Sequence, residues 1–411
     1  MVDPDVNGVF AAALGLTAPW QVMSVAFDEA LGELEIALDF PRGSVFPCGV
    51  DGCGATGCRV HDTTEKRWRH LDFFQHQAYL RARVPRVRCP EHGVHLVAVS
   101  WARPGSGFTM LMEAAMLTFA AQMPIAPLAR MAREHDTRIW RVIEHHVGAA
   151  RSTLDLSSVT KVGIDETSAR RGQDYVSIFM DLDDPRVVFA TPGRDAETVK
   201  AFAEDLKAHK GNPETQVAEV CCDMSGAFIS GVAEYLSEHP AEEIESEDGA
   251  EVPVVSADAQ SEEEEEPVLH TPEIVFDRFH VVMKLNEAID EVRRQEVKSR
   301  PELKRTRYTW LKNEENLTDK QRTDLLWLTR PSMNLKTARA ARWRDDFNAF
   351  YEQETHEDAE FYLKRWCDRA NRSRLEPVRA FVRTVKAHFD GILAWQDKKI
   401  TNDRASYCAS C

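Results

Sequence analysis

The sequence predicts an α+β multidomain protein in which a small cysteine-rich module precedes a larger α/β domain. Three observations support this prediction. The chain has 411 residues, which exceeds the usual size of a single domain. Residues 41–107 are rich in Cys, His, Gly and Pro, whereas residues 156–236 alternate apolar strand-like runs with amphipathic helical runs. Residues 281–396 then follow an almost uninterrupted helical pattern.

Composition limits the class of protein. Hydrophobic residues make up 43% of the chain and charged residues 29%, which is typical of a protein with a buried core. No run reaches the roughly 18 apolar residues of a membrane helix, and acids stand where a signal peptide carries basic residues. Nine Cys, an odd number, do not suit a disulfide scaffold. We therefore expect a cytoplasmic protein without a membrane partner.

The negative charge is concentrated in one segment. Residues 238–266 contain thirteen acids and no Lys or Arg, and without them the net charge of −16 becomes −3. This segment is predicted to be a disordered loop inside a domain. Residues 59–103 carry nine Lys or Arg against four acids, and residues 291–344 carry fifteen against seven. These basic blocks are compatible with local binding of a polyanion, although solvated protein faces explain the same counts.

The first two segments are read from apolar alternation and from cysteine spacing. Residues 1–40 combine a helix-compatible start with the alternating run LGELEIALDF. Residues 41–107 are loop-rich, and a stretch of this kind usually needs a disulfide or a bound metal ion to stabilise it. Two close Cys/His pairs about 35 residues apart are typical of a closed, structural zinc site. The expected ligands are Cys48, Cys53, Cys89 and His92. Three further residues are competing ligands, namely Cys58, His61 and His95. Reduced, buried cysteines without metal are the alternative.

Residues 108–155 are predicted to contain a helix-turn-helix. The run PLARMAREHDTRIWRVIEHHV fits a helix, a short polar turn and a second helix that starts at Thr137. Arg138 and Arg141, with Trp140 and Ile143 facing inward, suit a recognition helix on double-stranded DNA. Any two packed helices produce a similar pattern, so this segment alone does not establish DNA binding.

Two acids end apolar strands in residues 156–236. Asp165 ends VGID and Asp223 ends EVCCD, which puts both carboxylates at one edge of a sheet. Close carboxylates repel unless a divalent cation lies between them, and Mg²⁺ prefers oxygen ligands. A metal pair of this kind serves phosphoryl transfer. Acids at strand ends are also common as caps and loop residues, so the spacing alone leaves both interpretations open.

These blocks together resemble the DDE transposases of bacterial insertion sequences, in the ISL-three group. The similarity covers nearly the whole chain. It runs through CGVDGCGATGCRVHDTTEKRWRHLDFFQHQAYLRARVPRVRCPEHGV, VSWARPGSGFT, VGIDETSARRGQDYVSIFMDLD, VCCDMSGAFISGV, PEIVFDRFHVVMKLNEAIDEVRR, TRYTWLKNEENLT and HFDGILAWQDKKITN.

The resemblance implies a fold and an activity. It implies a zinc-ribbon-like module, a helix-turn-helix and a ribonuclease H-like domain over residues 156–411, interrupted by a mostly helical insertion over 281–396. It also implies Mg²⁺ or Mn²⁺ at the catalytic acids, with cleavage and joining of DNA at inverted-repeat element ends and target DNA. A homo-oligomer on DNA and a nucleoid-associated location follow from the same resemblance.

The same resemblance identifies site residues one by one. Asp165 in GIDET and Asp223 in CDMS match the first two catalytic acids, and Asp277 and His280 in FDRFH match a motif near the site. The third acid is where the sequence departs, because the family pattern ITNGRAEG is replaced by ITNDRASYCASC. Ser406 falls at the position of the catalytic Glu, and Ser is a poor Mg²⁺ ligand.

We therefore expect impaired transposase activity in a chain truncated at its C-terminus. Asp403, where the family has Gly, is too far out of position to replace the lost acid. The main alternative is a catalytically inactive DNA-binding remnant that occupies element ends. A metal-dependent nuclease that does not join strands is a third hypothesis.

Overall fold

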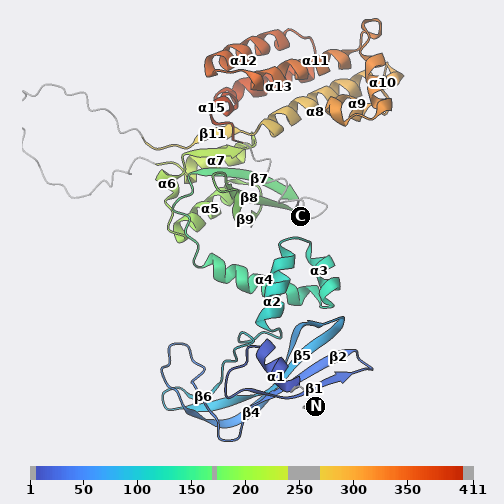
Figure 1. Ribbon diagram of the computed structural model, residues 1–411. Helices are drawn as coiled ribbons and strands as arrows, with labels where there is room; N and C mark the ends of the chain where they lie inside the picture. The colour runs from blue at the N-terminus through green and yellow to red at the C-terminus, as the bar shows by residue number, and fades with distance from the viewer. Residues whose placement is uncertain (1–5, 169–173, 239–268, 401–411) are drawn as a thin grey trace, which may run out of the picture. The chain divides into compact units, whose positions relative to one another are not determined.

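The computed structural model describes residues 6–168, 174–238 and 269–400 (Figure 1). The chain divides into two compact units, Met1–Arg151 and Ser152–Cys411. Most of the acidic segment 238–266, together with Asp403 and Ser406, lies outside the described residues. Within the described part of the chain, no helix is long and apolar enough to cross a membrane.

The first unit opens with helix α1 and a six-stranded sheet. The elements are α1 (Val6–Ala13), β1 (Gln21–Asp28), β2 (Glu33–Asp39), β3 (Val45–Phe46), β4 (Cys58–Phe73), β5 (His76–Cys89) and β6 (Gly93–Leu96). The strand order is β1-β2-β5-β4-β3, with β6 also paired to β5. Strands β4 and β5 form a long antiparallel hairpin, while β2 runs parallel to β5. The apolar alternation of LGELEIALDF is confirmed in β2, whose residues at every second position are buried.

An aromatic cluster fills the core of this sheet. The Trp101 ring lies edge-on to Trp20 and to Trp68, with centroids 4.9 and 5.7 Å away. All three indoles are buried, and the Leu80 side chain beside them has no exposed surface. Large rings of this kind contribute much of the apolar burial in a small domain.

Three helices complete the first unit. They are α2 (Met110–Ala120), α3 (Ile125–Ala132) and α4 (Asp136–Arg151). The expected inward position of Trp140 is wrong, because its side chain is 48% exposed. Ile139 and Val142 are buried instead, and Ile143 is partly buried as expected. Ile139, Val142 and Ile143 share one face of a helix with 3.6 residues per turn, and Trp140 lies about 100° around from Ile139.

The second unit contains a mixed five-stranded sheet. Its elements are β7 (Lys161–Ser168), β8 (Tyr175–Asp181), β9 (Arg186–Pro192), α5 (Ala196–Ala208), α6 (Pro213–Gln216), β10 (Glu219–Cys222), α7 (Gly226–Tyr235) and β11 (Glu273–Phe276). The order is β11-β10-β7-β8-β9, with β7, β8 and β9 antiparallel and with β10 and β11 parallel to β7. The alternation of strands and helices in residues 156–236 is thereby confirmed, in the ribonuclease H-like arrangement.

The core of this sheet lies under α5 and α7. The Phe202 ring of α5 stacks on Phe179 of β8 with centroids 4.5 Å apart. Gly231 lets α7 approach α5 closely, because a Cβ at this position would lie 2.8 Å from Cγ2 of Val199. The two helices therefore cover the same face of the sheet.

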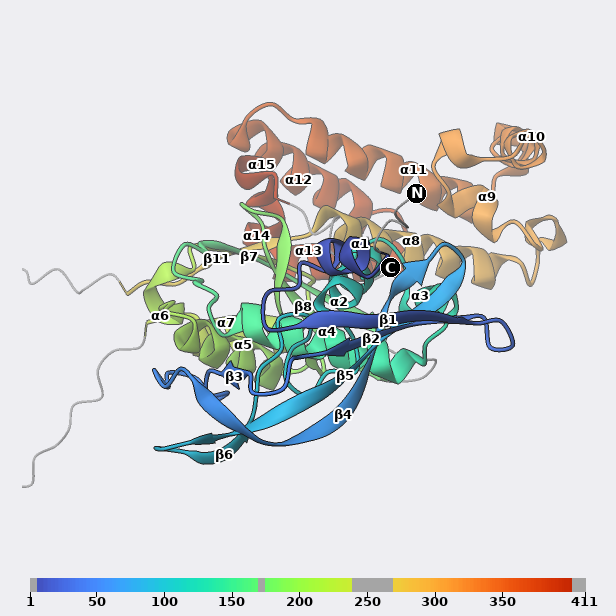
Figure 2. The same ribbon diagram turned by 60° about the horizontal axis from the view of Figure 1, so that its bottom comes forward.

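A bundle of helices follows β11 (Figures 1 and 2). It comprises α8 (Arg278–Glu296), α9 (Arg307–Leu311), α10 (Asp319–Leu328), α11 (Lys336–Asn348), α12 (His356–Asn371), α13 (Glu376–Ala387), α14 (Phe389–Leu393) and α15 (Trp395–Lys398). The buried Glu296 carboxylate caps α11 by accepting the N–H groups of Lys336 and Thr337, each at 2.7 Å. The bundle returns to the sheet, where Lys398 Nζ contacts Glu219 and Glu273 at 2.8 and 3.0 Å.

Candidate zinc module, DNA-binding helices and carboxylate site

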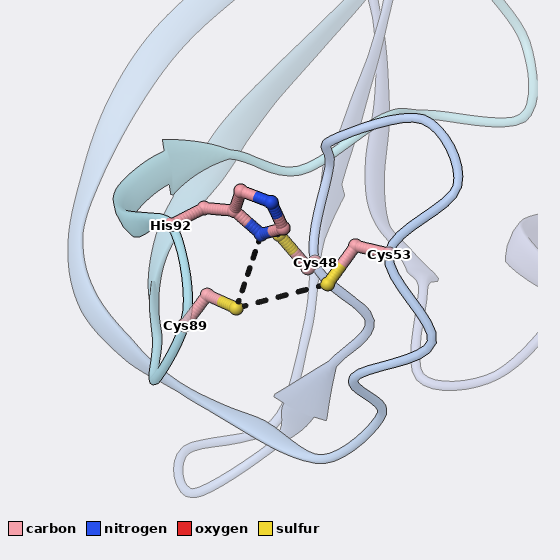
Figure 3. Close-up of side chains that lie close together, drawn as sticks. All are labelled: Cys48, Cys53, Cys89 and His92. Atoms are coloured by element: carbon pink, nitrogen blue, oxygen red, sulfur yellow. Dashed lines mark hydrogen bonds between the residues drawn. The ribbon is translucent and has the colours of Figure 1, made fainter.

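Four side chains of the first unit converge between two turns (Figure 3). Cys48 and Cys53 lie in the loop after β3, Cys89 ends β5, and His92 lies in the turn before β6. Each residue offers one ligand atom, and these atoms all lie within 4.8 Å of one another. Gly93 has φ +76°, a conformation that L side chains rarely adopt, so the turn beside His92 depends on glycine.

The distances in this group fit a tetrahedral zinc ion. Cys89 Sγ lies 3.8 Å from Cys53 Sγ and 3.7 Å from His92 Nδ1, and Cys48 Sγ lies 3.9 Å from the same nitrogen. Around an ion with Zn–S bonds of about 2.3 Å, tetrahedral ligands are about 3.8 Å apart. Four protein ligands leave no open position, so the geometry suits a structural ion.

The electrostatic surroundings favour the thiolate form of Cys89. The backbone N–H groups of His92 and Glu91 lower the pKa of the Cys89 thiol to about 6. The competing ligands expected from the sequence, Cys58, His61 and His95, are not members of the four-residue group. Cys58 is buried beside it with Sγ 4.0 Å from the Ala55 carbonyl oxygen, and burial raises the pKa of its thiol.

The two arginines expected on the recognition helix have different surroundings. Arg138 forms an ion pair with Glu134, and its guanidinium lies 4.2 Å from the centroid of the Phe108 ring. Arg141 is exposed on α4, next to the exposed Trp140. The outward surface of α4 therefore presents Arg141 and Trp140, whereas Arg138 is largely engaged within the unit.

Sequence reasoning missed a buried polar network that fixes α4. Glu113 of α2 is 1% exposed and accepts hydrogen bonds from Arg103 at 2.9 Å, Ser106 at 2.5 Å and His146 of α4 at 2.7 Å. A buried carboxylate needs such partners. Nothing in the local sequence marks Glu113, which reads as an ordinary polar residue of an apolar helix.

Three acids of the second unit lie at one level of the sheet. Strand β10 pairs with β7 through Cys221 and Gly163, so Asp223 and Asp165 each lie two residues further along parallel strands. Strand β10 pairs with β11 through Cys222 and Phe276, so Asp277 follows at the same level as Asp223. Asp223 and Asp277 follow the carboxyl ends of β10 and β11, and Asp165 lies level with Asp223. The expectation that Asp165 ends its strand is wrong, because β7 stays paired with β8 as far as Ser168.

Backbone groups and one histidine fix these carboxylates. Asp165 Oδ1 accepts the Glu166 N–H at 2.8 Å, and Asp223 Oδ1 accepts the Ser225 N–H at 2.9 Å. Asp277 is 2% exposed and caps α8. His280, in the first turn of α8, has Nε2 3.6 Å from Asp165 Oδ1. The sequence paired His280 with Asp277 in one motif but gave no indication that its ring reaches Asp165.

Negative charge accumulates at this edge of the sheet. Burial, together with the charges of Asp223 and Asp165, raises the pKa of the Glu166 carboxyl. Burial opposes protonation of His280, but the contact with the Asp165 carboxylate and the charges of Asp277 and Asp223 raise the pKa of its imidazole overall. Carboxylate oxygens are the ligands that hard divalent cations prefer, so the level pair Asp165 and Asp223 suits a divalent cation. Among the described residues, only the cysteine and histidine group of the first unit brings three or more possible ligand atoms together.

Comparison with known families matches three regions of the chain. Residues 162–242 and 241–405 match the ISL3 DDE family model, described as a transposase. Residues 97–147 match the helix-turn-helix domain of transposase family ISL3. Residues 47–92 match the zinc-finger of the transposases of IS204, IS1001, IS1096 and IS1165.

Curated relatives extend over most of the chain. The transposase for insertion sequence element IS1557 of Mycobacterium tuberculosis is 24% identical, over 92% of this chain and 84% of its own length. The transposase for IS1001 of Bordetella parapertussis is 25% identical, over 86% of this chain and 80% of its own. Since the ISL3 transposase model alone covers more than half of the residues, the chain belongs to the ISL3 family of transposases.

Proposed function

We propose that this chain acts on the ends of its own insertion sequence by divalent-metal-dependent phosphoryl transfer, with Asp165 and Asp223 as the acids that hold Mg²⁺ or Mn²⁺. The observation that carries the proposal is the level position of these acids on the adjacent parallel strands β7 and β10. A bound cation would neutralise charge on the transferred phosphate and activate the attacking oxygen.

The chain's own residues hold this site in place. The Glu166 and Ser225 N–H groups fix one oxygen each of Asp165 and Asp223, and His280 lies against Asp165 from α8. Catalysis of phosphoryl transfer depends on positioning and charge neutralisation, so such fixed carboxylates supply much of what the reaction needs. We infer in addition a homo-oligomer on DNA and a nucleoid-associated location.

The residue at the position of the third catalytic acid decides between the proposed activity and its alternative. Ser406 stands where the family resemblance expects the catalytic Glu, and a hydroxyl would leave the site one negative charge short. We therefore propose that cleavage is impaired, and that the alternative is a DNA-binding protein that occupies element ends without cutting them.

A direct test uses an end-labelled duplex that carries one terminal repeat of the element, incubated with the protein and Mg²⁺ or Mn²⁺. Strand cuts with joined products support the transposase reaction. Cuts without joining indicate a nuclease. Retained binding with neither product supports the alternative of a DNA-binding remnant.

The helix-turn-helix gives a prediction for DNA binding. Arg141→Ala should weaken binding to the element-end duplex by about tenfold, because a lost base or phosphate contact typically costs 1–3 kcal/mol. Arg138→Ala should weaken it less, since its guanidinium already pairs with Glu134 and covers Phe108. Fluorescence anisotropy measures both affinities, with far-ultraviolet circular dichroism as the control for folding. Equal losses for the two variants would contradict this assignment.

The acidic segment gives a second prediction. Deleting residues 238–266 removes thirteen negative charges that repel phosphates, so binding to random-sequence DNA should tighten and should depend more steeply on salt. Affinity measured across a salt series tests this. Unchanged affinity would instead indicate a surface loop without an electrostatic role.

A further inference from the structure

The basic block of residues 59–103 is mostly neutralised by acids of the first unit. Six of its nine Lys and Arg side chains form ion pairs, namely Arg67, Arg69, Arg81, Arg83, Arg86 and Arg103. None of the described residues forms an ion pair with Arg59, Lys66 or Arg88. Lys66 lies opposite the buried Ala82 and lines a cavity beside Trp68. The uncompensated charge on the exposed surface of this block is therefore that of Arg59 and Arg88.

Arg59 and Arg88, the arginine pair, lie directly opposite each other on the antiparallel strands β4 and β5. Both residues are exposed, and residues paired in this way have Cβ atoms about 4.5–5.5 Å apart. Two like charges at such positions repel each other and destabilise a sheet. An anion bound between the two guanidinium groups would offset this repulsion, because each group could donate two parallel hydrogen bonds to it.

The nearest acids along the chain are engaged elsewhere. Asp62, opposite Arg86 on the same two strands, accepts the Arg86 Nε–H at 2.6 Å, and its second oxygen pairs with Nη2 of the same guanidinium. Glu91, in the turn after β5, has Oε2 4.0 Å from Cys53 Sγ. The arginine pair therefore faces solvent without a carboxylate partner.

The expected zinc ion would restrain the strands that carry the arginine pair. Arg88 immediately precedes the ligand Cys89, and Arg59 immediately follows Cys58, which is buried beside the four-residue group. On its two outer sides the pair is flanked by the exposed Val45 of β3 and Val94 of β6. A closed metal site restrains the backbone of its ligands, so the pair is largely preorganised for binding an anion.

We propose that Arg59 and Arg88 together bind one phosphate of the DNA backbone, as a contact of the zinc module that does not depend on base sequence. Arginine recognises phosphate oxygens through its planar fork of N–H groups, and two forks across neighbouring strands can share one phosphate. The inference rests on the proposed function, because it assumes that the chain binds DNA.

The competing explanation is a charge balance within the module. Three thiolates and one Zn²⁺ carry one net negative charge, which two nearby guanidinium groups could compensate without any ligand. This explanation predicts that loss of the arginine pair weakens zinc retention and leaves DNA binding unchanged.

The experiment measures the affinity of the zinc-loaded full chain for a random-sequence duplex and for an element-end duplex across a salt series. Wild-type protein is compared with Arg59→Ala, Arg88→Ala and the double variant. Arg83→Ala is the matched control, since Arg83 is an exposed residue of β5 that pairs with Asp39 at 2.6 Å. Zinc content and thermal unfolding are measured for each protein.

Loss of one phosphate contact should reduce the slope of log affinity against log salt by about one. Because both arginines share one phosphate, the double variant should lose about one and not two, equally on both duplexes, while Arg83→Ala should keep the wild-type slope. If the double variant lost its zinc, the slope of Arg59→Ala would decide, since Arg59 is not adjacent to an expected ligand.

Unchanged slopes in all three variants would overturn the proposal, as would an equal reduction in Arg83→Ala. Reduced zinc content with wild-type DNA binding would establish the charge balance instead. Wild-type protein that binds neither duplex would overturn the proposed function as well, whereas wild-type binding with unchanged variants would overturn this inference alone.

Discussion

Replacing Cys89 with Ser is expected to release zinc and to unfold residues 41–107 without melting the second unit. Cys89 Sγ lies close to two other members of the four-residue group, Cys53 and His92. Its replacement therefore removes one of the four expected zinc ligands. Structural zinc sites have apparent binding free energies of about 10–16 kcal/mol, which is folding free energy for the module around them. Elemental analysis should find about one zinc per wild-type chain and little in the variant.

The matched control for this prediction is Cys58→Ser. Cys58 is also buried and lies beside the group but is not a member of it, so this variant should keep its zinc. Limited proteolysis should then cut Cys89→Ser rapidly in the first unit and leave Cys58→Ser intact. Wild-type protein prepared without chelator that contains no zinc would contradict the site itself. Zinc loss from Cys58→Ser equal to that from Cys89→Ser would place Cys58 among the ligands.

The second large effect concerns DNA cleavage by the 411-residue protein. Its rate on element ends should lie at least about a hundredfold below that of a family member with Glu at the third position, because one lost electrostatic partner of a transition state typically costs this much. Ser406→Glu restores the charge but not the surrounding sequence, which also departs from the family pattern. Quantified strand cuts per minute with Mg²⁺ and with Mn²⁺ check both statements.

Robust Mg²⁺-dependent cleavage that Asp223→Asn abolishes would show that the third acid lies elsewhere. Glu166→Gln and Asp277→Asn would then identify it. Asp277 is nearly inaccessible and caps α8, with its Oδ1 3.2 Å from the Phe279 nitrogen. Glu166 is partly exposed, and the charges of Asp165 and Asp223 act on it. In that case the Glu166 variant is expected to lose more activity, while the Asp277 variant is expected to lose stability.

The features that the sequence predicts are those encoded within short stretches. The apolar runs before Asp165 and Asp223 predict two strands, although β7 continues past Asp165 to Ser168. The spacing of Cys48, Cys53, Cys89 and His92 predicts two knuckles. Each pattern lies within a few residues, so local propensity and turn chemistry suffice to identify it.

The remaining features depend on register between distant segments. The parallel pairing of β2 with β5 and the level position of Asp277 follow from strand partners that no local pattern specifies. Trp140 is a similar case, because apolar character alone did not decide whether it or Ile139 faces the core.

The chain of the helical bundle leaves the sheet and returns to it at the edge strand β11. The chain leaves β11 directly into α8, and more than a hundred residues later α14 returns to the same strand, where a Cβ on Gly391 would lie 2.5 Å from Cε2 of Phe276. Because the chain leaves and re-enters the sheet at neighbouring points, a helical insertion of another length can connect the same two points without distorting the strands. Chimeras that exchange the bundle beyond the first turn of α8 between related transposases should therefore keep Asp165, Asp223 and Asp277 aligned, because the pairing of β7, β10 and β11 fixes the level of these acids.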